Sequence, residues 1–483
     1  MAVGITSYGA YIPFHRMSRE VFYKAWGGAK MPGERAVCNF DEDSLTMAWE
    51  AAADCLRGVD ANKVDGLFFA TTTASYLERL EASILAVTLD LREDIRTMDV
   101  TDTLRAGTTA FAAAADAVKA KSAKNVLVAA SDHRMAAPAG DFEMALGDGA
   151  AAVLVGDKNV IATIEGSHHI SDEFSGVWRP EGEQFIRCWE DRMVYDKGYS
   201  EILEKGINGL LKKYDMKASD FAKVVYDTTL ESRRHPQMAK QLKLEDKQVQ
   251  DPLFDTVGNT GSAHAMLMLV AALEDAKPGD KILWASYANG VDAFILEVTP
   301  EIEKLAPRRG FKKHLANKHM LENNDRYLRW RKIVPLERAR RSEQTPTSIA
   351  HLHRDAKIAL AMYGVKCKAC GTPQFSQGGS YGYFTPLRVC VDCQAVDQME
   401  PYKFSDKIGK IFTYTEDRLA DSNDPPTTVN VIDFIGGGRA LFDMTDRGGQ
   451  EVKVGMEVEM TFRKLYVDRG WHQYFWKTRP IRF

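Results

Sequence analysis

Four cysteines in the C-terminal third are the residues whose type and spacing point most directly to chemistry. Cys367 and Cys370 form one CxxC pair, and Cys390 and Cys393 form a second. Two such pairs at this separation are typical of a zinc ribbon, in which four thiolates surround the metal as a tetrahedron. Four sulfur ligands leave no open coordination position, so the predicted zinc is structural and takes no part in a reaction.

A second candidate site lies in residues 98–118, MDVTDTLRAGTTAFAAAADAV. This stretch predicts a short strand, a turn, and an alanine-rich helix that begins at Gly107-Thr108. The unpaired N–H groups of a helix's first turn point at whatever lies before it, which is a suitable place for a nucleophile. The turn offers Thr103, Leu104 and Arg105, with no cysteine or serine at its tip. Either the site has lost its reactive atom or its chemistry never required one.

The elements around this turn predict an α/β architecture over residues 1–300, because short β-branched runs alternate there with apolar, Ala-rich stretches. The expected strands are VDGLFFATTT, NVLVAAS, AAAVLVG, VVYDTT, KILWASYA and AFILEVT.

An internal repeat supports a duplicated α/β domain. The segments that begin at Asp102 and Asp255 each contain a DT turn, a helix start rich in small residues, an apolar helix and a strand that ends in AS. Two such segments of similar length indicate repeated helix–strand units. We expect one half of the duplicated domain over residues 1–165 and the other over 166–300.

The remaining chain changes character after residue 300. Residues 301–350 are basic and predict a helical linker, either a solvated surface or a contact for an acidic group. Residues 351–400 predict a helix followed by the zinc ribbon. Residues 401–483 contain short alternating strands with glycine turns, including Gly436–Gly438, and predict a small all-β barrel of the oligonucleotide/oligosaccharide-binding (OB) type.

Composition excludes several classes of protein. The chain is 45% hydrophobic and 27% charged, with a formal net charge of −4. No N-terminal signal segment or long apolar run is evident, so we expect a cytoplasmic protein without membrane association. Seven cysteines, four of them in CxxC pairs, fit a reducing compartment. Cys38, Cys55 and Cys188 are expected to pack without a reactive role.

Residues 1–300 resemble the hydroxymethylglutaryl-CoA synthase group of the thiolase superfamily. The matching segments include GITSYGAYIP, PGERAVCNFDEDSLTMAWEAA, LGDGAAAVLVG, GNTGSAHAM and AKPGDKILWASYANGVDAFILEVT. The resemblance implies a duplicated thiolase fold with five αβαβα layers, which is usually dimeric. Residues from about 350 to 483 resemble the zinc-ribbon and OB-fold proteins of the DUF35 type that accompany thiolases. That resemblance implies an acyl-CoA-binding adaptor.

The family's mechanism uses a Glu, a Cys and a His. The local matches place Thr72 at the glutamate position (or Thr73 if the register moves by one), Leu104 at the cysteine position and Asp227 at the histidine position. His235 reaches the histidine position only through a shift. The asparagine of the GN motif is retained as Asn259. The resemblance therefore implies an acyl-CoA ligand but no cysteinyl acyl-enzyme, because a leucine cannot attack a thioester.

Two interpretations follow from the replaced triad. In the favoured one, the chain is a pseudoenzyme, an auxiliary subunit in a hetero-complex with an active thiolase-type partner. In the alternative, it is a lyase of the aldolase type that acts on a β-hydroxyacyl-CoA and needs only a base and an oxyanion hole. Asp227 would be the base. Asn259 and the N–H groups at Gly107-Thr108 would stabilise the enolate, with His264 and Tyr226 in reserve.

A third, less favoured interpretation treats the zinc ribbon and OB barrel as a nucleic-acid module. The basic, aromatic segment TFRKLYVDRGWHQYFWKTRPIRF would suit one. We expect no nucleic-acid partner, because a barrel core also needs aromatic residues and CoA phosphates also need cations. Arg179 and Arg192, which lie in a segment that matches the synthase family, are the candidate CoA ligands. The cluster Asp132, His133 and Arg134 borders a substrate tunnel or caps the next element.

Overall fold

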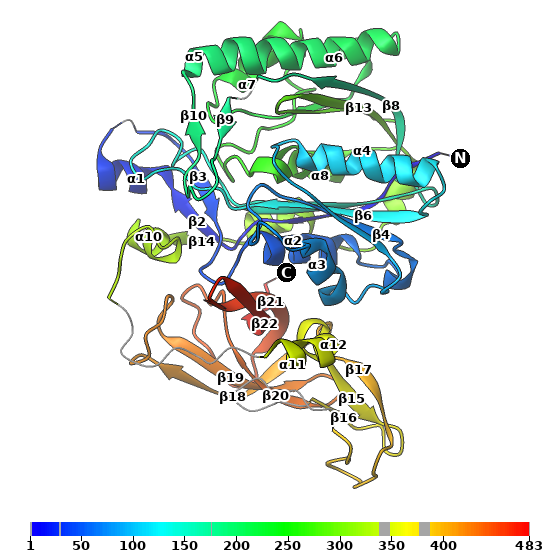
Figure 1. The fold of residues 1–483 in the computed structure, drawn as a ribbon, viewed down its shortest axis with the longest axis vertical. Coiled ribbons are helices and arrows are strands. Elements are labelled where there is room, and N and C mark those ends of the chain that lie inside the picture. Colours follow the sequence, from blue (N-terminus) through cyan, green and yellow to red (C-terminus); the bar gives the residue numbers. More distant parts are fainter. Residues whose placement is uncertain (1, 29, 175, 338–347, 376–386, 483) are drawn as a thin grey trace. The chain divides into compact units, whose positions relative to one another are not determined.

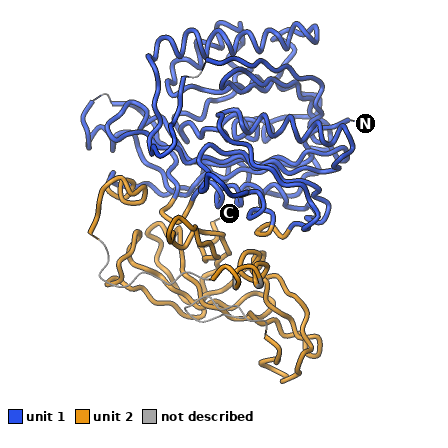
Figure 2. The backbone as a smooth tube through the Cα atoms, in the orientation of Figure 1, with its two compact units in different colours: residues 1–38, 43–86, 91–324 blue, residues 39–42, 87–90, 325–483 orange. Residues whose placement is uncertain are grey.

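The structure is a computed structural model that describes residues 2–28, 30–174, 176–337, 348–375 and 387–482. Parts of the predicted linker (338–347) and of the predicted zinc ribbon (376–386) therefore lie outside the described residues. The chain divides into two compact units (Figure 2). Unit 1 contains residues 1–38, 43–86 and 91–324, and unit 2 contains residues 39–42, 87–90 and 325–483. The finer division of the chain into five parts stays a prediction.

Unit 1 is built on one hydrogen-bonded sheet of nine strands in the order β11-β12-β13-β8-β1-β7-β6-β4-β5. These strands are β1 (Gly4–Tyr11), β4 (Gly66–Ala70), β5 (Arg96–Val100), β6 (Asn125–Asp132), β7 (Gly149–Gly156), β8 (Ala162–Ser171), β11 (Lys223–Tyr226), β12 (Lys281–Tyr287) and β13 (Gly290–Val298). All six strands expected between residues 64 and 299 are present. The two halves of the sheet meet where β1 pairs with β8 at only Gly4↔Thr163 and Ile5↔Ala162.

Helices separate and cover the two halves of this sheet, which gives the predicted five-layer αβαβα arrangement (Figure 1). Helix α6 (Glu201–Lys213) packs on β8, β12 and β13. Helices α4 (Ala106–Lys119) and α8 (His264–Asp275) lie side by side in the middle layer, and α2 (Ser44–Cys55) packs on β1, β6 and β7. The middle helices are apolar on nearly every side because a sheet layer lies above and below them.

The two halves repeat the same strand pattern. In the first, β4 and β6 are parallel and β6 and β7 are antiparallel; in the second, β11 and β12 are parallel and β12 and β13 are antiparallel. Helices α4 and α8 precede β6 and β12, as the internal repeat predicts. The edge strand β5 of the first half is reduced in the second to a single parallel bridge, Val224↔Val249.

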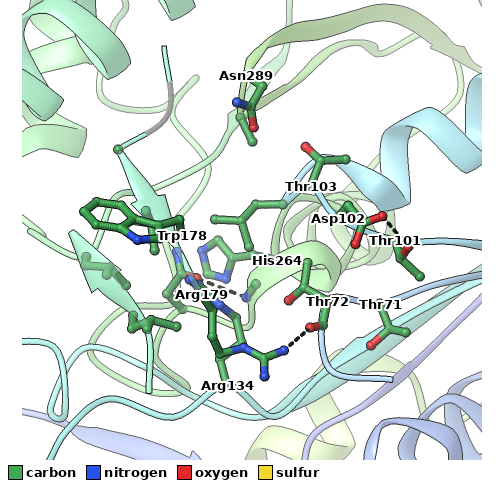
Figure 3. A pocket seen from close by; sticks show the side chains of 18 of the residues that line it. Thr71, Thr72, Thr101, Asp102, Thr103, Arg134, Trp178, Arg179, His264 and Asn289 are labelled. Carbon is green, nitrogen blue, oxygen red and sulfur yellow. Dashed lines mark hydrogen bonds between the residues drawn. The ribbon is translucent and has the colours of Figure 1, made fainter. Parts of the chain in front are cut away.

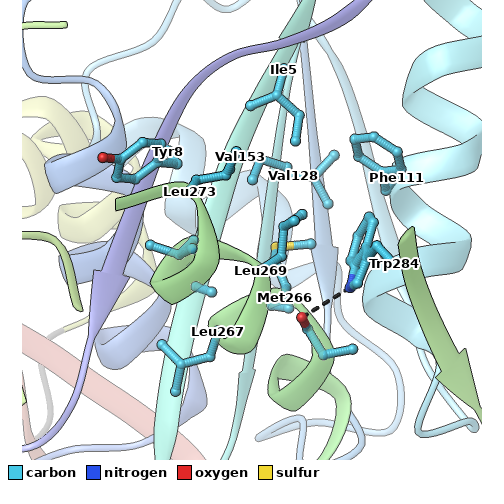
Figure 4. Close-up of a cluster of buried hydrophobic side chains, with 14 of the residues drawn as sticks. Ile5, Tyr8, Phe111, Val128, Val153, Met266, Leu267, Leu269, Leu273 and Trp284 are labelled. Carbon is cyan, nitrogen blue, oxygen red and sulfur yellow. Dashed lines mark hydrogen bonds between the residues drawn. The ribbon is translucent and has the colours of Figure 1, made fainter. Parts of the chain in front are cut away.

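The core of unit 1 lies between the layers, around the middle helices (Figure 4). Trp284 on β12 is fully buried and donates its indole N–H to the carbonyl of Ala265 at 2.9 Å. Its ring meets Phe111 of α4 edge to face at a centroid distance of 5.0 Å. One aromatic side chain thus connects both middle helices to the second half of the sheet.

The other elements of unit 1 are short. They are β2 (His15–Ser18), β3 (Glu34–Val37), β9 (Val177–Trp178), β10 (Arg187–Cys188), β14 (His319–Leu321), α1 (Arg19–Trp26), α3 (Glu81–Thr88), α5 (Asp191–Met193), α7 (Arg234–Gln241) and α9 (Gly310–Ala316). A π-helical segment, Val194–Ser200, joins α5 to α6. Residues 301–324, which the sequence assigns to a helical linker, belong to unit 1: α9 packs on α8 and β1, and β14 pairs with β2.

The described part of unit 2 contains two β sheets and three short helices. The helices are α10 (Asp325–Trp330), α11 (Ile349–Arg354) and α12 (Ala356–Ala361). The small sheet consists of β15 (Tyr363–Cys367), β16 (Pro373–Gln374) and β17 (Met399–Lys403). The larger sheet has the order β20-β19-β18-β21-β22, formed by β18 (Gly409–Asp417), β19 (Thr427–Phe434), β20 (Arg439–Asp443), β21 (Glu457–Asp468) and β22 (Trp471–Pro480).

The larger sheet has the topology of an OB barrel. A parallel bridge between Met444, just after β20, and Thr478 of β22 brings the two edges of the sheet together. Gly436–Gly438 form the predicted hairpin turn between β19 and β20, each with a positive φ. Among the described residues, no helix combines the length and the apolar character needed to cross a membrane.

Candidate functional site

A cavity of about 640 Å³ lies in unit 1 where strands of both halves end (Figure 3). Segments that follow β4, β5, β6, β11 and β12 line it, together with the loop around β9. In α/β sheets, ligands typically bind beside the carboxyl ends of parallel strands. The cavity brings together the following residues singled out from the sequence: Thr72, Leu104, Arg134, Arg179, Asp227, Asn259 and His264.

Leu104 lies in the cavity wall, half-buried, at the position where the family resemblance expects a cysteine. The turn before it contains Asp102 in a left-handed conformation, with φ of 70°. The sequence predicts that the N–H groups of Gly107 and Thr108 face the site, but neither residue is among those that line the cavity. The hydroxyl of Thr108 donates instead to the carbonyl of Arg105 and to the carboxylate of Asp292.

Asp292 fixes the start of α4 behind Leu104. Its carboxylate accepts hydrogen bonds from the hydroxyls of Thr108 and Thr109 and pairs with Arg105 at 2.8 Å. Burial alone would raise the pKa of this carboxyl, but the His169 hydrogen bond and the Arg105 charge lower it overall. Asp292 is therefore an ionised anchor of the turn and does not line the cavity.

Asp227 follows β11 and lies in the cavity wall with 8% of its surface exposed. One carboxylate oxygen accepts hydrogen bonds from the Ser286 hydroxyl at 2.6 Å and from the Tyr287 amide at 2.8 Å. Burial raises the pKa of this carboxyl to about 7, although both hydrogen bonds act in the opposite direction. A carboxyl group with a pKa near neutrality is suited to proton transfer at physiological pH.

Thr72 lines the cavity, but its hydroxyl is not available as an acid or base. It donates to Asp132 at 2.9 Å, and the Thr72 amide donates to the same carboxylate at 2.7 Å. Asp132 also accepts hydrogen bonds from the hydroxyls of Thr71 and Thr73 and from the Ser262 amide. This fully buried carboxylate holds the loops after β4 and before α8 together, which is the capping alternative of the sequence analysis.

Asn259 and His264 both line the cavity and are buried. The Asn259 side chain donates to the Thr228 carbonyl at 3.0 Å and accepts from the Gly261 amide at 3.0 Å. The Nδ1 atom of His264 accepts a hydrogen bond from the Thr260 amide at 3.3 Å. Burial lowers the pKa of His264 to about 4, so the ring is neutral at physiological pH and carries its proton on Nε2.

Two residues named in the sequence analysis lie outside the cavity lining: Tyr226, a reserve candidate, and His235, which reaches the family's histidine position only through a shift. Their rings stack at a centroid distance of 4.3 Å, and the Tyr226 hydroxyl donates to the His235 carbonyl. Burial lowers the pKa of His235 to about 3. Both side chains belong to the core beneath β11, and the sequence could not distinguish this packing role from a catalytic one.

The two arginines predicted to contact CoA differ in position. Arg179 lines the cavity and donates to the carbonyls of Thr72 at 2.7 Å and Glu183 at 3.2 Å. Arg192 is not part of the lining: its side chain is 92% exposed and lies 3.7 Å from Asp196. The geometry therefore groups only Arg179 with the candidate site.

Several cavity residues were not identified from the sequence. Tyr195, Tyr199, Tyr287 and Trp178 line the wall, and Ser286 lies behind Asp227. Tyr199 donates its hydroxyl to the backbone carbonyl of Asp227 at 2.7 Å. Ser286 belongs to the AS dipeptide of the internal repeat, which was the available signal, but only tertiary contact shows that its hydroxyl meets Asp227.

Gly261 supports the wall between Asp132 and Arg134. Its φ is 61°, and an added Cβ would lie 2.3 Å from the Asp132 carboxylate and 2.7 Å from the Arg134 side chain. We expect Gly261→Ala to lower the free energy of unfolding by about 1–3 kcal/mol, because the backbone is strained and Asp132 cannot move without breaking its hydrogen bonds. Chemical denaturation measures this. Gly279→Ala is the matched control, since its φ of 90° is also positive but nothing lies within 4 Å of the added atom.

The four cysteines of unit 2 form a compact cluster. The sulfur atoms of Cys367, Cys370, Cys390 and Cys393 all lie within 4.8 Å of one another. The Cys367–Cys393 and Cys370–Cys390 sulfur atoms are 3.7 and 3.5 Å apart. A zinc tetrahedron with Zn–S bonds of about 2.3 Å has edges of about 3.8 Å, so the donor set fits this metal.

Comparison with known proteins identifies the class of fold. A family model described as 3-oxoacyl-[acyl-carrier-protein] synthase III C terminal matches residues 211–297. The structure of 3-oxoacyl-(acyl carrier protein) synthase III from Pseudomonas aeruginosa covers 64% of this chain and 100% of its own, at 20% identity and a TM-score of 0.57. The structure of MvaS in complex with 3-hydroxy-3-methylglutaryl coenzyme A covers 69% of this chain and 92% of its own, at 20% identity and a TM-score of 0.59. Unit 1 therefore has a thiolase-type fold.

More similar sequences identify the family. The hydroxymethylglutaryl-CoA synthase of Pyrococcus furiosus is 31% identical over 318 residues, which are 63% of this chain and 90% of that protein. The hydroxymethylglutaryl-CoA synthase of Caldivirga maquilingensis is 30% identical over 350 residues, which are 70% of this chain and 99% of that protein. The chain belongs to the hydroxymethylglutaryl-CoA synthase family, as the motifs in its N-terminal 300 residues predict.

Proposed function

We propose that this chain binds a CoA thioester in the cavity of unit 1 and breaks or forms the Cα–Cβ bond of a β-hydroxyacyl-CoA without an acyl-enzyme. The observation that carries the proposal is the pairing of two features in one cavity wall. Leu104 removes the family's nucleophile, while Asp227 supplies a buried carboxylate whose pKa is raised to about 7. The sequence alone favoured an auxiliary role. The burial of Asp227 in the cavity wall favours a catalytic role for this chain.

In the cleavage direction, the Asp227 carboxylate takes the proton of the β-hydroxyl group. The hydroxyl oxygen becomes a carbonyl oxygen as the Cα–Cβ bond breaks, and the electron pair of that bond passes to the thioester as an enolate. Protonated Asp227 then returns its proton to Cα. The products are a shortened acyl-CoA and an aldehyde or ketone, and the reaction needs no other reactant.

The enolate oxygen would be stabilised by neutral donors in the same wall. With Nδ1 of His264 accepting from the Thr260 amide, Nε2 carries the ring proton. The Pro252 carbonyl acts on this ring as an acceptor, so an enolate oxygen would have to replace it as the partner of the N–H group. The amide of Asn259 is held in place by Thr228 and Gly261. Preoriented donors of this kind stabilise developing negative charge strongly.

The absence of a nucleophile gives a direct test. Incubation of the purified protein with acetyl-CoA is expected to leave its intact mass unchanged, because neither Leu104 nor the hydrogen-bonded hydroxyl of Thr72 can accept the acetyl group. Intact-protein mass spectrometry detects any covalent acetyl group. A stoichiometric acetyl adduct would contradict the proposed chemistry, and peptide mapping would identify the residue that carries it.

Cleavage itself is tested with a panel of β-hydroxyacyl-CoA thioesters and chromatography of the shortened acyl-CoA products. Turnover by the protein alone supports the lyase. If the thioesters bind but none is cleaved, the lyase proposal fails and the chain is an acyl-CoA-binding protein only.

An auxiliary role is the second candidate, and one observation favours it. Gly107 and Thr108, whose N–H groups were expected to stabilise the enolate, are not among the residues that line the cavity. In that role the chain, as a homodimer through unit 1, would join a thiolase-type partner and unit 2 would hold the acyl-CoA. Purification from the native host, followed by mass spectrometry of co-purifying chains, tests this: a stoichiometric partner with an intact cysteine supports it.

A further inference from the structure

Three tyrosines from the second half of the domain line the cavity, and two of them contact Asp227. Tyr195 and Tyr199 belong to the π-helical segment Val194–Ser200, and Tyr287 ends β12. The Tyr287 amide donates to the Asp227 carboxylate at 2.8 Å, and the Tyr199 hydroxyl donates to the Asp227 carbonyl at 2.7 Å. The Tyr199 and Tyr287 rings meet edge to face at a centroid distance of 5.7 Å. These three side chains, here called the aromatic wall, therefore adjoin the proposed base.

The polar ends of two of these tyrosines are turned toward the protein. The Tyr199 hydroxyl is already engaged by a backbone carbonyl. The Tyr287 hydroxyl is buried without a hydrogen-bond partner among the described residues and packs against Gly198, where an added Cβ would lie 2.5 Å from its oxygen. Burial raises the pKa of Tyr195, of Tyr199 and of Tyr287, so all three side chains are neutral. Trp178 of β9 adds a further ring to the lining (Figure 3).

We propose that the substituent on Cβ of the substrate is an aromatic ring, so that the preferred ligand is a β-aryl-β-hydroxyacyl-CoA and the carbonyl product is an aromatic aldehyde or ketone. Aromatic rings pack best edge to face or in offset stacks, and a pair of rings that already meets edge to face offers both arrangements to a third. This inference names the substrate class for the proposed function and rests on it.

The contact with Asp227 assigns the aromatic wall to the Cβ substituent and not to CoA. In the proposed mechanism Asp227 takes the proton of the hydroxyl group on Cβ, and the substituent in question is bonded to that same carbon. The pantetheine arm is joined to the acyl group on the other side of Cβ, through Cα and the thioester. Its two amide groups also need hydrogen-bond partners, which a wall of neutral rings with engaged or enclosed hydroxyls does not supply.

Binding of three thioesters that lack the β-hydroxyl group, and so cannot be cleaved, tests the inference. 3-Phenylpropanoyl-CoA, 3-cyclohexylpropanoyl-CoA and butanoyl-CoA differ only in the phenyl, cyclohexyl or methyl group on Cβ. By isothermal titration, the full-length protein is expected to bind the phenyl thioester about 10- to 100-fold more tightly than butanoyl-CoA, because more apolar area is buried. It is expected to bind the phenyl thioester about 3- to 10-fold more tightly than the cyclohexyl thioester, because aromatic pairs gain energy beyond area burial. A cavity that recognises only apolar surface would favour cyclohexyl, the more apolar group.

Substitution of Tyr287 tests whether the aromatic wall produces this preference. Tyr287→Leu is expected to remove the preference for phenyl over cyclohexyl. Tyr287→Phe is expected to keep it, since the ring remains and only a hydroxyl without a partner among the described residues is lost. Tyr23→Leu removes a half-buried ring of α1 outside the cavity lining and is the control, which should also keep the preference. The readout is the ratio of two affinities, which a uniform loss of binding does not change.

Two results would overturn the inference. One is a cyclohexyl thioester that binds the wild type as tightly as the phenyl thioester, or more tightly; this comparison needs no variant and so does not depend on how Tyr287→Leu folds. The other is an unchanged phenyl preference in Tyr287→Leu. If none of the three thioesters binds, the proposed function and the inference fail together.

Turnover separates the inference from the proposed function. Cleavage of 3-hydroxy-3-phenylpropanoyl-CoA passes the hydroxyl proton through Asp227 to Cα and gives benzaldehyde and acetyl-CoA, which together contain every atom of the substrate. A higher kcat/KM for this thioester than for 3-hydroxybutanoyl-CoA, measured by chromatography of both products, supports the two proposals. An equal or higher kcat/KM for 3-hydroxybutanoyl-CoA keeps the lyase and rejects the aryl preference. A phenyl preference in binding without cleavage of either compound rejects the lyase and keeps an aromatic acyl-CoA as the ligand.

Discussion

Asp227→Asn is expected to lower turnover of a β-hydroxyacyl-CoA by about 100- to 10,000-fold, because the amide has the shape of the carboxylate but cannot accept a proton. The KM should change little, since Asn can still accept the hydrogen bonds of Ser286 and Tyr287. Steady-state kinetics with a cleaved thioester measures both constants. Ser286→Ala, which removes one donor and keeps the carboxylate, is the matched variant and is expected to retain most activity. If Asp227→Asn keeps wild-type turnover, Asp227 is not the base.

The pH dependence provides an independent check on the same residue. Because the base must be ionised, wild-type turnover should rise with pH through about 7 and level off above it. In Ser286→Ala the rise should move to higher pH, since the lost hydrogen bond stabilised the ionised form. A rate that is flat between pH 5 and 9 would exclude a base with this pKa.

Stability should change with pH in a direction set by the same shift. The folded-state pKa of Asp227 is raised from 3.8 to about 7. Folding therefore favours the protonated carboxyl, and the stability this group contributes below pH 4 is lost as pH rises through 7. Asp227→Asn should consequently be at least as stable as the wild type above pH 7, so a loss of turnover there cannot be ascribed to unfolding.

Cys390→Ser is expected to have the largest effect on stability. The protein should contain one zinc per chain by elemental mass spectrometry, and this variant should lose nearly all of it. Structural zinc binding supplies about 10–16 kcal/mol in small zinc domains, so loss of a ligand should unfold the ribbon. Limited proteolysis is expected to cut within 363–375 and 387–403 in the variant or after chelation, and not at these residues in the zinc-loaded wild type.

Cys188→Ser is the control for this substitution, because Cys188 is half-buried and not part of the sulfur cluster. It should keep the zinc and the protease resistance. Since unit 1 contains none of the four sulfur ligands, thioester binding by unit 1 should survive loss of zinc. A metal-free wild type that resists proteolysis within 363–375 and 387–403 would contradict the structural role.

Much of the fold could be predicted from sequence because it depends on patterns that are local. The runs VVY and KILWASY are β-branched and apolar, and they form β11 and β12. The repeat between residues 102 and 255 predicted that α4 with β6 and α8 with β12 are equivalent units, since each segment carries its helix and strand in the same order. The CxxC pairs predicted the sulfur cluster, because the spacing of cysteines alone defines a zinc knuckle.

The details of the site could not be predicted, because they depend on contacts between segments far apart in the chain. Asp132 accepts a hydrogen bond from the Thr72 hydroxyl, 60 residues away in the sequence. Asp227 accepts one from the Ser286 hydroxyl, 59 residues away. The sequence also does not show that Arg134 lines the cavity with its Nη1 atom buried and without a hydrogen-bond partner among the described residues, since burial depends on the folded surroundings. Arg179 and Arg192 were equally good candidates for CoA binding in the sequence, because only the folded structure shows that Arg179 lines the cavity and Arg192 does not.

The short seam between β1 and β8 has a consequence for the site. Leu104 and Thr72 belong to the first half of the duplicated domain, while Asp227, Asn259 and His264 belong to the second. Within the described residues, β1 and β8 pair at two positions, Gly4↔Thr163 and Ile5↔Ala162. An added Cβ at Gly4 would lie 2.1 Å from the Ala162 carbonyl oxygen. A side chain at Gly4 would therefore force the two halves of the sheet apart at this pairing, and with them the cavity residues that each half contributes.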